Sequence, residues 1–156
     1  MDYKIENLSK QPQCQRLLKV GGLGILSVTA LAVALADPSQ FKNGRNFAAW
    51  IGLVPKHTGT GGKNRILGIS KRGDTYLRTL LIHGARAKLQ GINRKFVNGT
   101  KLDSLEDWAY RLSQRQGSNK ATVALANKNA RIAWSLSANK TEFDPKQAAI
   151  SSKKVA

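Results

Sequence analysis

The sequence predicts an all-α protein, and three observations lead to this class. Apolar residues recur at helical spacing in several separate segments. No segment shows the apolar–polar alternation that is typical of a half-buried strand. Hydrophobic residues make up 41% of the 156 residues, which is enough for the core of one domain. We therefore expect helices joined by turns and loops.

The predicted domain begins with a helical pair that is interrupted by glycines. Residues 1–14 form a lead-in, and a helical domain follows over residues 15–139. Its first part, residues 15–36, predicts a short amphipathic helix over 15–20 and a well-buried apolar helix over 25–35. An Asp-Pro pair ends the second helix, since the residue before proline avoids the helical conformation.

The turn between these two helices reads V-G-G-L-G and is similar to the turn of a helix-hairpin-helix element. In such elements the backbone N–H groups approach a DNA phosphate, because glycine leaves them uncovered. Gly22 and Gly24 are the glycines expected to do so here. The proline usual in that element is absent, and a plain αα-hairpin is the alternative.

The middle of the chain predicts two helices separated by a basic loop. A short helix spans residues 41–53. Residues 56–74 form a loop dense in Gly, Lys and Arg, and Asp74 is placed to cap the next helix. Apolar residues recur at helical offsets over residues 77–85, and Gly91 marks the predicted end of that helix.

The C-terminal part predicts two further helices and a tail. A helix starts with a capping box at Ser104 and ends at Gly117. Ser118 or Asn119 is expected to cap the last helix. Residues 140–156 are polar and rich in lysine, so we expect a flexible tail there.

Positive charge dominates the sequence and is concentrated in one window. Lys and Arg number 26 against nine Asp and Glu, which gives a net charge of +17. Residues 56–95 hold ten basic residues and one acid, a net charge of +9. Such a window can follow a phosphate backbone and release its counterions, so the predicted partner is a nucleic acid. The residues expected to contact it are Lys56, Lys63, Arg65, Lys71, Arg72, Arg78, Arg86, Gly22 and Gly24.

The scarcity of cysteine, histidine and acids excludes several classes of protein. One cysteine and two histidines cannot supply a disulfide framework or a zinc finger. Nine scattered acids argue against a two-metal nuclease that acts alone. Cys14 is expected to be an inert thiol. Residues 20–36 are apolar but rich in glycine, so we expect no membrane span and a cytoplasmic location.

Hydroxyl groups in the basic loop are candidate nucleophiles. Thr58, Thr60 and Ser70 lie among cations that would stabilise the charge formed when a hydroxyl attacks a phosphodiester. Threonines in loops are also common turn formers. The loop is no Walker motif, because Lys63 is followed by Asn64 rather than by Ser or Thr.

Two runs of residues carry a resemblance to a known family. Residues 37–56 read D-P-S-Q-F-K-N-G-R-N-F-A-A-W-I-G-L-V-P-K. Residues 60–87 contain T-G-G-K followed by G-I-S-K-R-G-D-T-Y-L-R-T-L-L-I-H-G-A-R-A. Both runs resemble the C-terminal helical domain of DEDD/Piv-type insertion-sequence transposases, the IS-one-ten and IS-eleven-eleven families. The similarity covers about residues 15–137.

The resemblance implies DNA transposition and recombination through a hydroxyl nucleophile. In this family an N-terminal RNase-H-like domain supplies four acids that bind a divalent metal. A serine of the C-terminal domain attacks DNA and forms a covalent serine–phosphate link. Thr60 stands at the position of that serine, and Ser70 is a second candidate.

The resemblance also sets expectations about cofactors and partners. The chain looks like a truncated transposase without the metal-binding domain. No cofactor is expected in this chain, and Mg²⁺ is expected only together with that domain. DNA, a structured guide RNA and a second copy of the chain are the expected partners. On its own, the chain is expected to bind DNA without catalysing transposition. A basic structural nucleic-acid-binding protein of ribosomal type, without strand-transfer chemistry, is the alternative.

Overall fold

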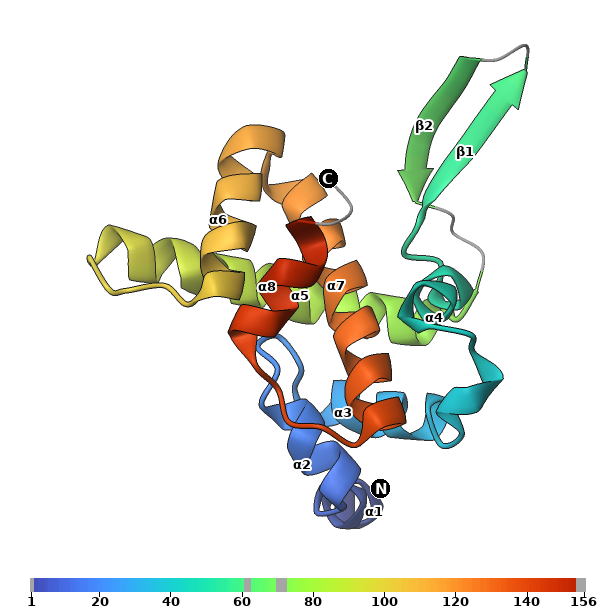
Figure 1. Ribbon diagram of the computed structural model, residues 1–156. Coiled ribbons are helices and arrows are strands. Elements are labelled where there is room, and N and C mark those ends of the chain that lie inside the picture. The colour runs from blue at the N-terminus through green and yellow to red at the C-terminus, as the bar shows by residue number, and fades with distance from the viewer. Residues whose placement is uncertain (1, 61–62, 70–72, 154–156) are drawn as a thin grey trace.

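The computed structural model describes residues 2–60, 63–69 and 73–153. It confirms the all-α class, since helices form nearly all of the regular structure in these residues (Figure 1). In chain order the elements are α1 (Asp2–Ser9), α2 (Pro12–Leu18), α3 (Ile25–Ala34), the 3-10 helix η1 (Pro38–Gln40), α4 (Gly44–Ile51), β1 (Pro55–Thr60), β2 (Lys63–Ile69), α5 (Thr75–Val97), α6 (Ser104–Gln116), α7 (Ser118–Asn139) and α8 (Pro145–Lys153).

Helix α7 lies at the centre of the fold. It packs against α4, α5 and α6, and Figure 1 shows it running through the middle of the helical body. Ala126, Ala130 and Ala133 of this helix are fully buried, and such small side chains let neighbouring helices approach closely. Phe47 of α4 and Leu81 of α5 are also fully buried and belong to the same core.

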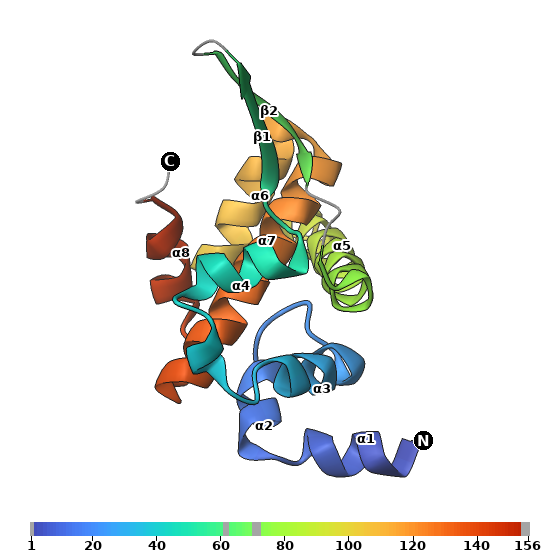
Figure 2. The ribbon, with the colours of Figure 1, turned by 90° about the vertical axis from the view of Figure 1, so that its right-hand side faces the viewer.

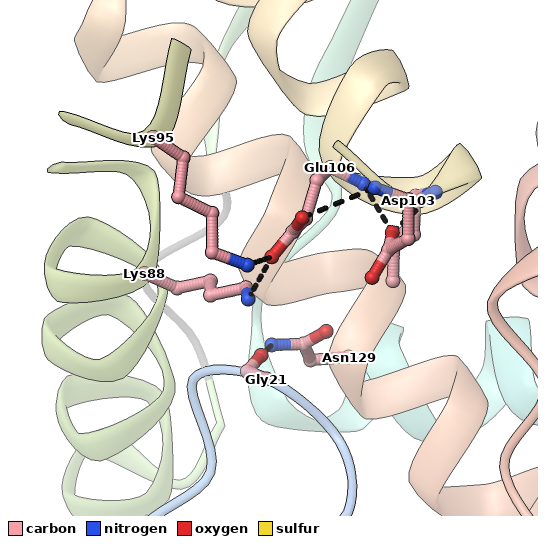
Figure 3. Close-up of polar contacts among 7 residues, drawn as sticks. Gly21, Lys88, Lys95, Asp103, Glu106 and Asn129 are labelled. Atoms are coloured by element: carbon pink, nitrogen blue, oxygen red, sulfur yellow. Dashed lines mark hydrogen bonds and ion pairs between the residues drawn. The ribbon is translucent and has the colours of Figure 1, made fainter. Parts of the chain in front are cut away.

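The predicted helical pair near the N-terminus is present as α2 and α3, which pack against each other, but α2 begins at Pro12, inside the segment predicted as a lead-in. The turn between them is held by the rest of the fold. Gly22 has a φ of +94°, and a Cβ at Gly84 of α5 would lie 1.9 Å from the Gly22 carbonyl oxygen. Asn129 of α7 donates a hydrogen bond of 3.1 Å to the Gly21 carbonyl (Figure 3). A DNA-binding role of the helix-hairpin-helix kind stays a prediction.

Helix α3 is less buried than its apolar sequence predicts. Val28 and Leu31 are fully buried, but Ile25, Leu26 and Val33 are exposed by half or more. The reason is that α1, α2 and α5 cover only one side of this helix. In the described part of the chain, no helix is long and apolar enough to cross a membrane.

The loop predicted over residues 56–74 contains a β-hairpin instead. Strands β1 and β2 are antiparallel, with Pro55 opposite Ile69 and Thr60 opposite Lys63. Both views show the hairpin projecting away from the helices (Figures 1 and 2). The run mixes Lys, Gly, Thr and Arg, so the apolar alternation used to predict strands is missing. The signal that does predict a hairpin is the Gly-Gly pair between the two strand sequences.

Helix α5 starts as predicted but ends later than predicted. The Asp74 carboxylate accepts a hydrogen bond of 2.9 Å from the Leu77 backbone N–H, which confirms the cap. The helix then continues through Gly91 to Val97. A glycine inside a helix costs only about 1 kcal/mol. Leu89 and Ile92, both buried, hold this part of α5 in the core.

The predicted caps of the next two helices are each displaced by one or two residues. The capping box of α6 is formed by Asp103 and Glu106 rather than by Ser104. Gly117 ends α6 as predicted, but it is also the residue that precedes α7. Its φ of +87° turns the chain there, so neither Ser118 nor Asn119 caps the helix.

The predicted flexible tail over residues 140–156 is wrong over residues 145–153, which form α8. This helix packs against α6, and its Ala148 is buried. The Asp144 carboxylate accepts a hydrogen bond from the Lys146 backbone N–H and so stabilises the first turn. Small and polar residues dominate this segment, and Ala148 alone is buried among the side chains described at positions 145–150, so no apolar periodicity predicts the helix.

Candidate nucleic-acid interface

The hairpin places the predicted nucleophile at its outer end. Thr60 is the last residue of β1 and pairs with Lys63, the first residue of β2. Thr58 pairs with Arg65 one step further in. Residues two apart on a strand share a face, so positions 58, 60, 63 and 65 fall on one face of the hairpin. The backbone register therefore pairs two threonine positions with two of the predicted basic positions.

Three other predicted residues lie outside the described part of the chain. They are Ser70, Lys71 and Arg72. Lys56 lies on β1, near the base of the hairpin, beside the irregular pairing between Pro55 and His57. Its backbone belongs to the hairpin, and its role in binding stays a prediction.

Arg78 lies inside the protein, at the base of the hairpin. Its side chain belongs to the first turn of α5 and is only 8% exposed. Nη1 donates a hydrogen bond of 3.2 Å to the Ile51 carbonyl at the end of α4. The hairpin connects the end of α4 to the start of α5, so Arg78 ties together the two helices that carry it. A direct phosphate contact by Arg78 stays a prediction, and the described geometry favours a positioning role.

Two further contacts fix the base of the hairpin, and the sequence analysis missed both. Gly73 has a φ of +113°, and a Cβ there would lie 2.0 Å from the Trp50 carbonyl oxygen. Asn127 of α7 donates a hydrogen bond of 3.0 Å to the Leu53 carbonyl. The glycine in K-R-G-D signals a turn that needs positive φ, but the partner of Asn127 lies 74 residues away along the chain. Such a distant partner leaves no local signal.

Helix α5 carries fewer free cations than its sequence suggests. Arg86 and Arg94 are exposed on its surface. Lys88 and Lys95 instead bind the buried Glu106 carboxylate at 2.5 and 2.8 Å (Figure 3). Two of the ten basic residues of the window are therefore already paired with a carboxylate of the protein, although both remain partly exposed.

The Glu106 carboxylate is held in its charged form. Burial alone would raise its pKa, but the hydrogen bonds from Lys88, Lys95 and the Asp103 backbone N–H outweigh burial and lower the pKa to about 2. The same hydrogen bond raises the pKa of Lys95. Glu106 joins α5 to α6 through these contacts and also completes the capping box of α6. It has a structural role and lies well away from the hairpin, because Lys88 and Lys95 are in the second half of α5.

The two predicted turn glycines lie in different environments. Gly22 is partly buried, with its backbone in contact with Gly84. Gly24 is exposed, precedes the first turn of α3, and has open space around its Cβ position. Of the two, Gly24 is the better placed to approach a phosphate.

The described residues do not form a metal site. Within residues 2–60, 63–69 and 73–153, no group of three His, Cys, Asp or Glu side chains lies close enough to hold an ion. Cys14 is buried, and burial raises the pKa of its thiol, as expected for an inert cysteine. The described part of this chain therefore does not fit the Mg²⁺ that the resemblance associates with these transposases.

Comparison with known proteins identifies the class of this molecule. A sequence model of the Transposase IS116/IS110/IS902 family matches residues 14–98. A probable family 20 transposase of Pseudomonas aeruginosa is 46% identical over 153 residues, which cover 93% of this chain and 44% of that protein. The transposase for insertion sequence element IS1111A of Coxiella burnetii is 46% identical over 79% of this chain and 32% of its own length.

A third relative is the transposase for insertion sequence element IS1328 of Yersinia enterocolitica, which is 39% identical over 88% of this chain and 39% of its own length. These matches and the helical fold define a transposase-related protein. The chain belongs to the IS116/IS110/IS902 transposase family. It spans less than half of the length of each of these three relatives.

Proposed function

We propose that this chain binds DNA as the C-terminal part of an insertion-sequence transposase, and that the β-hairpin is its main contact. The observation that carries the proposal is the register that brings Thr60 and Lys63 together at the outer end of the hairpin. The hairpin base is fixed to α4, α5 and α7 by the contacts of Arg78, Gly73 and Asn127. A fixed base and a projecting tip suit insertion of the tip against a phosphate backbone.

In this proposal the Thr60 hydroxyl takes the place of the family's serine nucleophile. Lys63 and Arg65 lie in register with the two threonines and would stabilise the negative charge that develops on the phosphoryl oxygens. The described residues provide no carboxylate cluster for a metal. We therefore propose that this chain binds DNA but does not cleave or rejoin it alone. A structured guide RNA is a second proposed ligand.

The first prediction concerns binding. The chain should bind element-end DNA with an affinity that falls with salt at a log–log slope of about −4 to −5, as expected if about five phosphates are neutralised. Lys56→Ala, Lys63→Ala and Arg65→Ala together should reduce the slope by about 2–3, because each lost contact removes roughly 0.9. Fluorescence anisotropy at several salt concentrations gives the affinity and therefore the slope for each protein.

The matched control removes the same charge elsewhere. Lys4, Lys101 and Lys146 are exposed and lie outside the hairpin, and their triple alanine variant should keep most of the slope. Equal effects of the two triple variants would show that binding depends on net charge rather than on the hairpin. Binding to structured RNA without measurable binding to DNA would favour the structural RNA-binding alternative.

The second prediction is that the purified chain forms no covalent adduct with DNA. Element-end DNA, the element's own RNA and magnesium are incubated with the protein, and the products are separated on a denaturing gel. An adduct that is absent from the Thr60→Ala variant would contradict the proposed inactivity and identify Thr60 as the nucleophile. An adduct lost instead in the Ser70→Ala variant would assign the role to Ser70.

A further inference from the structure

A pocket of about 550 Å³ lies between α7, the start of α4 and the segment that leads into α8. It is at the end of α4 that is opposite to the hairpin, and the proposed function does not use it. Its volume falls within the range of small-molecule sites, roughly 300–1,000 Å³. Its walls include Gly44 and Arg45 from α4 and Lys128, Arg131 and Trp134 from α7.

A buried lysine without a hydrogen-bond partner forms part of the pocket wall. Lys128 is 4% exposed, and its ammonium group makes no hydrogen bond to any described residue. The group lies 4.7 Å from the centroid of the Trp108 ring, which provides a cation–π contact. An ammonium group removed from water needs compensation beyond one aromatic ring. Burial, and after it the charge of Arg131, lower the pKa of Lys128 to about 8.

Two arginines extend this cationic wall. Burial and the nearby charge of Arg45 lower the pKa of Arg131. No ion pair to a described acid is formed by Arg45, Lys128 or Arg131. Cations that repel one another are stabilised by an anion placed between them.

The acids of the pocket wall have other partners. Glu142 forms an exposed ion pair of 2.6 Å with Lys19 of the segment after α2. The Asp144 carboxylate accepts a hydrogen bond from the Lys146 backbone N–H at the start of α8. Neither acid forms an ion pair with the three pocket cations.

The first turn of α4 adds to the positive potential of the pocket. No acid lies in this turn, and the Asn43 side chain accepts a hydrogen bond from only one of its N–H groups, that of Asn46. A helix N-terminus with free N–H groups attracts anions. A Cβ at Gly44 would lie 3.1 Å from the Arg131 carbonyl oxygen, so the first turn of α4 packs against the backbone of α7 at Arg131.

The pocket also offers an aromatic side. Trp134 and Phe143 line it, and the Trp134 indole N–H donates a hydrogen bond of 3.1 Å to the Pro38 carbonyl, which fixes the ring. The pocket combines cations, a helix N-terminus, the fixed Trp134 ring and the Phe143 ring. This combination suits a ligand with an anionic group and a flat apolar part.

We propose that this pocket binds a nucleotide unit, with its phosphate held by Arg45, Lys128 and Arg131 and the first turn of α4. The nucleotide comes either from the nucleic acid chain or from the free pool, and both sources share the same phosphate chemistry. The site is separate from the hairpin, so its test does not depend on the proposed function.

The experiment is isothermal titration of the full chain with a deoxynucleoside 5′-monophosphate, with inorganic phosphate and with the matching nucleoside. The monophosphate should bind, and the nucleoside should bind at least about tenfold more weakly, because it lacks the anionic group. Lys128→Met keeps the apolar stem and removes the charge. It should weaken binding of the monophosphate about tenfold or more. Lys120→Met, at an exposed position of the same helix, is the control and should change binding less than about twofold.

Thermal unfolding without ligand separates binding from a structural role. Removal of a buried, unpaired charge should leave the Tm of Lys128→Met unchanged or raise it. A lower Tm with unchanged monophosphate binding would overturn the proposal and assign Lys128 to the packing of Trp108. If Lys128→Met does not fold, Arg45→Gln replaces it, because Arg45 is exposed and its substitution spares the core.

Single-stranded oligonucleotides distinguish the two sources of the phosphate. In the background of the hairpin triple variant, Lys128→Met should weaken oligonucleotide binding if the pocket holds a nucleotide of the chain. If Lys128→Met weakens binding of the monophosphate but not of the oligonucleotide, the pocket is assigned to a free nucleotide. Wild-type protein that binds neither phosphate nor monophosphate, with oligonucleotide affinity unchanged in Lys128→Met, would refute the site.

Discussion

Glu106 is a buried carboxylate that holds two lysines of α5 and the first turn of α6 (Figure 3). Its exposed fraction is only 3%, so its charge depends on these partners. Two of its partners, Lys88 and Lys95, come from different turns of α5, and the third is the Asp103 backbone N–H before α6, so the carboxylate links the two helices. Loss of this one charge is expected to loosen both.

The third prediction concerns the pH dependence of stability. The folded-state pKa of Glu106 is about 2, against 4.5 for the free group, so the stabilisation is complete above about pH 5 and is lost as the pH falls toward 2. A shift of this size corresponds to about 3 kcal/mol. Glu106→Gln should therefore lower the free energy of unfolding at pH 7 and flatten its decline between pH 5 and pH 2. Urea denaturation across this range measures both effects.

Glu6→Gln is the matched control for this prediction. Glu6 forms an exposed ion pair with Lys10, and such pairs contribute less than about 1 kcal/mol. Its variant should follow the wild-type curve at every pH. A Glu106→Gln curve parallel to that of the wild type would show that the carboxylate is not held charged by Lys88 and Lys95.

At the scale of elements, the contact between α5 and the turn before α3 sets a strict limit on residue size. The fourth prediction compares two glycines of the same helix. Gly84→Ala should destabilise the protein strongly, because its Cβ would lie 1.9 Å from the Gly22 carbonyl oxygen. Gly91→Ala should stabilise it by about 0.5–1 kcal/mol, since no atom lies within 4 Å and alanine favours the helix. Thermal denaturation should show a lower Tm for Gly84→Ala and a higher Tm for Gly91→Ala. Equal changes in Tm would contradict the close contact at Gly84.

The elements show how far the sequence predicts this fold. The cap at Asp74 and the apolar face of α5 are local patterns, and the sequence predicts both. The predicted end of α5 at Gly91 is wrong, because buried neighbours keep this glycine in the helix. The sequence does not predict the hairpin, because its two strand sequences show no apolar alternation. It does not predict α8 either, because Ala148 alone is buried among the side chains described at positions 145–150. The contacts at the hairpin base join residues far apart in the sequence, and no local pattern reveals them.

Much of the candidate site was predictable, and the remainder needed three-dimensional contacts. The basic window follows from the composition of residues 56–95, and the resemblance to the transposase family implies Thr60 as the counterpart of its serine, which stays a prediction. The burial of Arg78 does not, because a basic residue near a helix start reads as an exposed cation. The register that pairs Thr60 with Lys63 also depends on where the hairpin turns. The pocket at Lys128 combines α4, α7 and the segment before α8, which no motif connects.

At the scale of the whole molecule, an apolar face of α3 is left uncovered. The fifth prediction is self-association through Ile25, Leu26 and Val33, whose exposed fractions are 52%, 51% and 70%. Exposed apolar patches of this kind promote association. Light scattering should show a mean mass that rises with concentration, and Leu26→Lys with Val33→Lys should keep the chain monomeric.

A charge-matched control completes this test. Ser39→Lys and Gln40→Lys add the same two charges in η1, at exposed positions, and should leave association unchanged. A wild-type chain that remains monomeric at high concentration would contradict the prediction. Association that both variants reduce equally would trace it to net charge instead of to α3.

The close approach of Gly73 to the Trp50 carbonyl has a consequence for how this protein can vary. It means that the chain leaves the helical body after α4 and returns to almost the same place before α5. The hairpin is therefore an insertion whose two ends meet, and a short connector could close the gap with little loop entropy. A chain in which such a connector replaces the hairpin should keep the arrangement of the helices beneath it. In the proposed function the hairpin carries the DNA contact, so substitutions along this arm should change binding, whereas substitutions in the helical body should change stability.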